Sequence, residues 1–137
     1  MAVWRKKMTN RYETWLMEEL HSIDNFSYED IKLLDIYPLE VSKQVLKVLI
    51  ENSCLGQNYG SIELGRIKIS EIDKDWLKQY FIEVANECIN YSDEWEYRRL
   101  LELVVYAIPE LKHQILEFGM NSENEEIREV VEDFQNL

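Results

Sequence analysis

The sequence has little of the glycine and proline that a turn-rich β fold uses. Its 137 residues include only four glycines and two prolines. Such a composition favours helices, because these two residues are the least compatible with helix interiors. The length suits one domain, and the 46% of apolar residues suffice for one continuous core. We therefore predict a single all-α domain over residues 1–137.

Cysteine and histidine are also scarce, with two of each. Cys54 and Cys88 lack metal-ligand spacing; we favour two buried thiols in a reducing cytosol, with a single disulfide as the alternative. His21 and His113 fall on different predicted helices and have no neighbouring ligand, so no metal site and no cofactor is predicted. Glu117 lies four residues after His113 and is in reach of a surface pair with it.

Several functional motifs are missing from the chain. No GxSxG, Walker or GxGxxG pattern occurs. The N-terminus lacks the apolar stretch of a secretory signal. The longest apolar run, residues 103–108, is far too short to cross a membrane. We expect a cytoplasmic protein that neither cradles phosphate nor contacts a membrane.

Positive charge is confined largely to the N-terminus. Residues 1–12 hold four basic residues and no acid, so residues 13–137 carry a formal charge of −16. This surface repels phosphate backbones, and we expect no nucleic-acid partner. It attracts a basic protein and speeds the encounter with it. The alternative is that the acidity only keeps the protein soluble.

Apolar residues recur at helical spacing along most of the chain and predict six or seven helices. The first stripe includes Trp15 as a core position. Helical order returns with Ser70 and Asp73, Asp93 stands where an N-cap is expected, and Gly119 suits a C-terminal cap. The stripes lie within residues 8–23, 31–34, 41–49, 76–89, 100–108, 111–118 and 127–134.

Residues 53–70, SCLGQNYGSIELGRIKIS, interrupt this order and hold three of the four glycines. Ile62 and Leu64 alternate with polar neighbours. We predict an ordered long loop here, with a small β-hairpin as a variant of it. Long loops in compact domains are often functional. An enzyme that uses Glu63 or Glu71 of the carboxylate-rich segment 56–71 is the least favoured class, because the segment offers no nucleophile–base pair and no metal-ligand spacing.

A weak repeat relates two later segments at an offset of 30 residues. Tyr97 and Arg98 match Ile127 and Arg128, and an apolar pair and a glutamate follow in both. An arginine in this position can bond carboxylates or carbonyls of an adjacent helix, or it can serve recognition. The pattern is that of stacked helical repeats, in which each unit buries its face on a neighbour.

These segments, DEWEYRRLLEL (residues 93–103) and NSENEEIREVVEDF (residues 121–134), look like degenerate HEAT-type repeats. With the long Gly-containing GRIKIS-type loop before them and the acidic balance, the chain resembles the small HEAT-like immunity proteins of bacterial toxin–immunity systems, including polymorphic-toxin and contact-dependent inhibition systems. The resemblance implies stacked helical hairpins, no enzymatic activity and a tight protein partner, usually a toxin domain.

The candidate binding residues combine aromatic side chains with carboxylates. Tyr and Trp dominate interface hot spots but also fill cores, so both uses stay open for each tryptophan. Trp4 is a further tryptophan near a terminus. The predicted partner-binding residues are Tyr59, Glu63, Asp73, Asp75, Trp76, Glu94, Trp95 and Glu96. The leading hypothesis is an inhibitor of a basic toxin domain; a helical adaptor or homo-oligomeric assembly protein is the alternative.

Overall fold

A computed structural model describes residues 10–137, and this part of the chain is all-helical. It contains no β-strand. The segment holding Trp4 and the basic residues 5–7 lies outside the described residues. The α-helices are α2 (Arg11–His21), α3 (Leu39–Cys54), α4 (Tyr59–Ser70), α5 (Lys74–Cys88), α6 (Glu94–Ala107), α7 (Lys112–Met120) and α8 (Glu125–Gln135). Two 3-10 helices join them, η1 (Tyr28–Ile36) and η2 (Pro109–Leu111).

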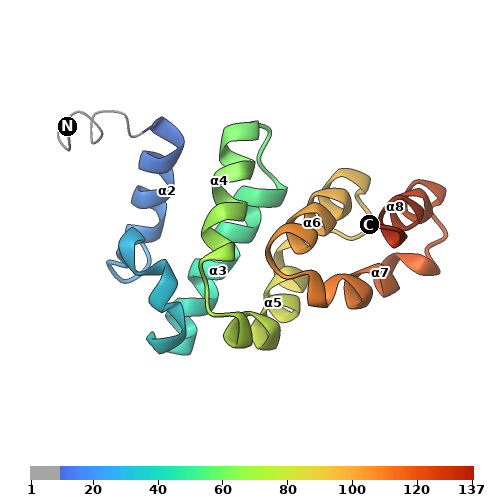
Figure 1. Cartoon of the computed structure of the whole chain (residues 1–137). Helices are drawn as coiled ribbons and strands as arrows, with labels where there is room; N and C mark the ends of the chain where they lie inside the picture. Colours follow the sequence, from blue (N-terminus) through green and yellow to red (C-terminus); the bar gives the residue numbers. More distant parts are fainter. Residues whose placement is uncertain (1–9) are drawn as a thin grey trace.

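The helices follow one another in a row, from α2 at one end to α7 and α8 at the other (Figure 1). Helix α3 packs against α2, α4, α5 and α6, so it joins the two halves of the row. Helices α7 and α8 pack on each other and both contact α6. None of the helices in residues 10–137 has the length and apolarity that a membrane crossing requires.

Buried side chains form one continuous cluster that runs from Leu16 in α2 to Phe134 in α8. The prediction for Trp15 is wrong: Leu16 and Leu20 are buried, whereas the Trp15 side chain is 57% exposed. The stripe of α2 is narrow, and Trp15 lies at its edge. It packs edge-on against Tyr12, with ring centroids 5.7 Å apart.

The prediction of a long loop or β-hairpin at residues 53–70 is also wrong. After a short turn the chain forms α4, so the helical segments exceed the six or seven expected. Gly56 lies in this turn, whereas Gly60 and Gly65 lie inside α4. A Cβ on Gly65 would lie 2.3 Å from the Ser53 hydroxyl oxygen, which means that α3 and α4 touch along their backbones. None of the glycines has a positive φ.

The helix starts follow local rules. The side chains of Asp73 and Asp93 accept hydrogen bonds from the backbone N–H groups of Trp76 and Glu96, as N-caps do. Gly119, in contrast, lies inside α7 and is not a C-terminal cap. A Cβ there would lie 2.7 Å from the Tyr97 hydroxyl, so the glycine permits close packing of α7 on α6.

Candidate functional site

An open groove of about 590 Å³ separates the end of α3 and the start of α4 from the start of α6. We call it the Trp95 groove. Residues 54–57 at the end of α3 and in the turn after it form one side of the groove together with Ile62 of α4. The N-cap and the first two turns of α6 form the other side. The lining residues are Cys54, Leu55, Gly56, Gln57, Ile62, Asp93, Trp95, Glu96 and Arg99.

Two carboxylates of the groove are held in place by backbone N–H groups. Asp93 caps α6 through a hydrogen bond from the Glu96 N–H to its Oδ1 atom, 3.0 Å long. The Glu96 Oε1 atom accepts a bond from the Asn90 N–H, 2.9 Å away. These contacts order both side chains and use only one oxygen of each. A carboxylate accepts up to about four bonds, so both keep acceptor capacity.

Trp95 stands between these carboxylates in sequence and is 63% exposed. The Arg99 guanidinium carbon lies 5.9 Å from the centroid of the Trp95 ring, one helical turn further along α6. Across the groove, Leu55 is 41% exposed and Tyr59, the first residue of α4, is 66% exposed. This end of the molecule therefore presents large apolar side chains to solvent.

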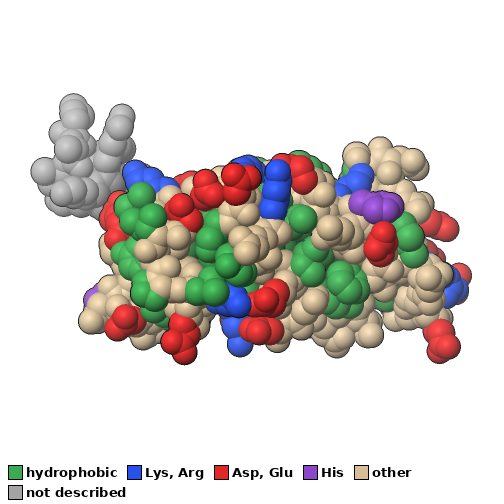
Figure 2. Space-filling view, turned by 90° about the horizontal axis from the view of Figure 1, so that it is seen from below, with side chains coloured by type: hydrophobic (Ala, Val, Ile, Leu, Met, Phe, Trp, Pro, Cys, Tyr) green, Lys and Arg blue, Asp and Glu red, His purple; other side chains and the backbone are tan. Residues whose placement is uncertain are grey.

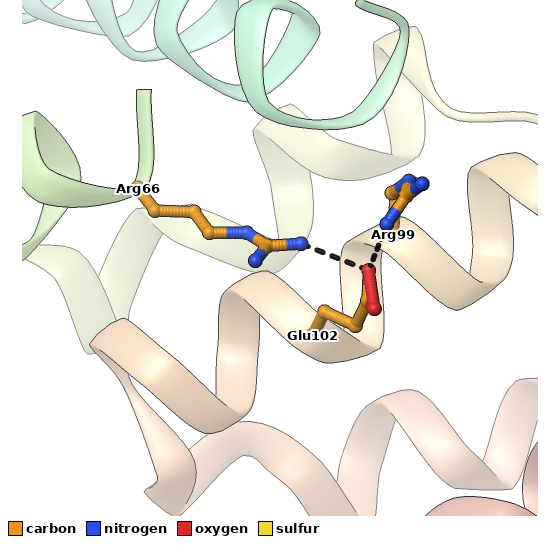
Figure 3. Close-up of polar contacts among 3 residues, drawn as sticks. All are labelled: Arg66, Arg99 and Glu102. Carbon is orange, nitrogen blue, oxygen red and sulfur yellow. Dashed lines mark hydrogen bonds and ion pairs between the residues drawn. The ribbon is translucent and has the colours of Figure 1, made fainter. Parts of the chain in front are cut away.

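Arg99 also belongs to an ion-pair cluster that closes the groove towards the middle of α4 and α6. Arg66 Nη2 and Arg99 Nη1 both donate to the Oε1 atom of Glu102, over 2.8 and 2.7 Å (Figure 3). The Arg66 Nε is buried without a hydrogen-bond partner among the described residues. Two guanidinium groups thus share one carboxylate, which leaves the cluster one positive charge in excess.

The predicted binding residues fall into two groups at opposite ends of α6. Trp95, Glu94 and Glu96 lie at its start, where Glu94 and Glu96 are half-buried. Tyr59 begins α4 beside groove residues. Exposed Glu63 follows one helical turn later on the same face.

Asp73, Asp75 and Trp76 lie at the other end. The Lys74 ammonium of α5 donates to the carbonyl of Ala107, the last residue of α6. Since the 14 residues of α6 span about 20 Å, the Asp73–Trp76 segment is remote from the groove. Trp76 is also half-buried against the core.

The arginines of the repeat behave differently. Arg98 joins α6 to α8 through an ion pair with Asp133, 3.0 Å long, and it also lies 3.8 Å from Glu94. The bracing interpretation is therefore confirmed for Arg98. Arg128 instead donates to the carbonyl of Ser122 in the preceding turn. The expected surface pair of His113 and Glu117 is present at 3.3 Å.

Both cysteines are free thiols, Cys54 buried and Cys88 half-buried. Burial, and to a smaller extent the charge of a nearby Cys88 thiolate, raise the pKa of Cys54. Burial raises the pKa of Cys88 to about 12. The structure therefore agrees with two protonated thiols, one of which lines the groove.

A second exposed apolar surface lies at η1 and the start of α3. It consists of Leu33, Ile36 and Leu39, which are 42, 72 and 42% exposed. Figure 2, which views the molecule from below, shows hydrophobic side chains near the end beside the grey residues and also over the middle of this face. We call the surface formed by Leu33, Ile36 and Leu39 the Ile36 patch. None of these three side chains is aromatic, and none lines the Trp95 groove.

Comparison with known proteins adds no relative. No protein-family model matches the chain, and the curated proteins and solved structures contain nothing significantly similar to it.

Proposed function

We propose that the protein is an immunity protein that binds a basic toxin domain in the cytoplasm and neutralises it by covering the toxin's active site. The single observation that carries the proposal is the exposed Trp95 ring, which stands beside ordered carboxylates in an open groove. Exposed aromatic side chains of this kind are the commonest anchors of protein interfaces. The resemblance of residues 93–103 and 121–134 to HEAT-like repeats supports the same function, and we propose that the row of helices is a short HEAT-like stack.

The charge of the chain defines the expected partner. The −16 charge of residues 13–137 favours a protein with a positive surface, such as a nuclease domain that binds phosphates. Carboxylates would steer the encounter, while Trp95 and Tyr59 would supply buried contact area. To cover the toxin's active site, the protein must bind the toxin tightly, but it need not catalyse a reaction itself.

The experiment is co-expression of the protein with the product of the adjacent gene, followed by purification and binding kinetics. We expect a stable complex whose association rate falls steeply between 50 mM and 500 mM NaCl, since salt screens long-range attraction. Toxin activity should disappear in the complex. An adjacent product that neither binds nor is inhibited contradicts the proposal, and an association rate independent of salt contradicts its electrostatic part.

A helical adaptor or homo-oligomeric assembly protein is the second candidate, and the Ile36 patch favours it. Exposed clusters of large apolar side chains mark interaction sites when they are contiguous. This candidate predicts a molecular mass that rises with concentration in sedimentation velocity. Ile36→Ser should then restore the monomer, while Trp95→Ala should not.

A further inference from the structure

We propose that the Trp95 groove receives one arginine or lysine side chain of the partner, with its cationic head between the Trp95 ring and the carboxylates of Asp93 and Glu96. The inference rests on the proposed function in one respect, that the partner is a basic protein. It adds the place of docking and the type of side chain that docks. The groove, its charges and its exposed ring each contribute to the argument.

The two carboxylates are suited to a cation because they are already ordered. One oxygen of each carboxylate accepts a hydrogen bond from a backbone N–H, and no donor among residues 10–137 bonds the other oxygen. Bonds between a guanidinium or ammonium group and a carboxylate are stronger than neutral ones. A cation that binds here therefore gains two charged acceptors without the entropic cost of ordering them.

The remaining surfaces of the groove fit the rest of a basic side chain. Leu55, which is 41% exposed, provides apolar surface for the methylene stem that long basic side chains commonly bury, and Ile62 and Cys54 add only the 3 and 4% of their surfaces that are exposed. Trp95 offers an indole ring that is 63% exposed, and tryptophan is the best aromatic partner for a cation. A free cation in solution lacks the stem contacts, so the groove favours a side chain over a small ion.

Arg99 makes one end of the groove positively charged. Its guanidinium lines the groove on the side towards Glu102, where Arg66 adds a second positive charge and only Glu102 opposes them. An incoming cation is repelled from that side and attracted to the side of Asp93 and Glu96. The excess positive charge thus selects the position of the head group.

The other two described tryptophans lack this combination. Trp76 is half-buried and stacks on Tyr80, with ring centroids 5.1 Å apart. Trp15 is exposed and has the Arg11 guanidinium carbon 5.8 Å from its ring, much as Trp95 has Arg99 at 5.9 Å, but Trp15 does not line the groove. Trp15 therefore serves as a matched control for an exposed ring outside a groove.

The first test uses short peptides and the full chain. The protein, labelled with ¹⁵N, is titrated with Ac-Gly-Gly-Arg-Gly-Gly-amide and with versions that carry lysine, neutral citrulline or glutamate at the centre. We expect the arginine and lysine peptides to shift the indole N–H signal of Trp95, assigned by Trp95→Phe, together with amides of residues 54–57 and 93–99. The citrulline and glutamate peptides should not. Equal shifts from the citrulline peptide, or larger shifts at Trp15 than at Trp95, overturn the inference.

The second test uses the complex with the adjacent gene product. Asp93→Asn with Glu96→Gln removes two charges but keeps both hydrogen-bond acceptors, and Asn is as good an N-cap as Asp. Glu125→Gln with Glu126→Gln removes two exposed charges from the first turn of α8 and is the matched control. We expect the first pair to weaken the complex by about 30-fold or more, and the control by less than about threefold.

The outcomes separate the inference from the proposed function. A complex that both double variants weaken equally refutes docking in the groove and leaves the immunity function intact. Peptide shifts at Trp95 without any complex refute the immunity function and leave the groove as a site for basic side chains. If the complex forms, but the arginine and lysine peptides cause no shifts at Trp95 and the two double variants weaken the complex equally, then docking in the groove is refuted and the immunity function is not.

Discussion

Gly65 of α4 lies against Ser53 of α3 with no room for a side chain between them. A Cβ on Gly65 would be 2.3 Å from the Ser53 hydroxyl oxygen and 3.0 Å from the Ser53 backbone nitrogen. That hydroxyl already donates to the Leu49 carbonyl over 2.8 Å. The α3–α4 pair is fixed by this backbone contact, and the turn between the two helices forms one wall of the Trp95 groove.

Gly65→Ala should therefore destabilise the protein. The intrinsic gain of alanine over glycine in a helix is about 1 kcal/mol. Overpacking against the α3 backbone costs about 1–3 kcal/mol and can exceed it. Urea unfolding followed by circular dichroism measures the difference. Gly60→Ala is the control, because its Cβ would meet side chains and no backbone of another helix: the ring of half-exposed Tyr12 and, at 3.3 Å, the Asn58 side-chain oxygen. A stabilised Gly65→Ala variant contradicts the tight contact.

Glu102→Gln should destabilise the protein by about 1–2 kcal/mol, because two guanidinium groups would then share a neutral amide. The side chains of Arg66 and Glu102 are only 16 and 30% exposed, so solvent screens them incompletely. The control is Glu110→Gln, whose ion pair with Lys78 joins side chains that are 44 and 48% exposed and should matter little. Equal unfolding midpoints in urea for the two variants would show that the cluster is not a brace.

The thiols predict a loss of stability in alkali. Burial raises the pKa of both Cys54 and Cys88 above that of an unfolded thiol, about 8.5. Their contribution is complete below that pH and is lost as the pH rises towards the folded value, about 12 for Cys88. Each thiol contributes a slope of at most about 1.4 kcal/mol per pH unit, and less for Cys88, which solvent partly screens.

The measurement is urea unfolding at several pH values between 7.5 and 10.5. In the variant with Cys54→Ala and Cys88→Ala the free energy of unfolding should fall less steeply with pH than in the parent. Tyr97, whose pKa burial raises to about 12, contributes equally to both proteins and cancels in the comparison. Parallel pH profiles would contradict buried, protonated thiols.

Features set by residues close in sequence could be predicted, whereas those set by distant contacts could not. The cap at Asp93 follows from its spacing to Glu96 within one helical turn, and it is present. The prediction of a loop in place of α4 is wrong because glycine usually signals a turn, whereas Gly65 instead permits close contact with a neighbouring helix. The pair of Arg66 and Glu102 spans 36 residues, and nothing in either local sequence indicates it.

The candidate site was predicted in part for the same reason. Trp95 and Glu96 were found from their composition, and both line the groove. Trp76 was grouped with them although it lies at the other end of α6, because composition alone does not reveal position. The groove itself depends on how the α3–α4 turn faces α6, which only the tertiary structure determines.

Asp93 combines a structural role with a charge that faces the groove, and the two can be separated. Asp93→Ala removes the side-chain acceptor for the Glu96 N–H and should lower the free energy of unfolding by about 1 kcal/mol. Asp93→Asn keeps an acceptor and should change stability by only a few tenths of a kcal/mol. Urea unfolding compares the two, and Asp73→Ala with Asp73→Asn at α5 repeats the comparison outside the groove. If the asparagine variant is as unstable as the alanine variant, the charge itself holds the start of α6, since a cap that works only through its hydrogen bond does not distinguish the two acceptors.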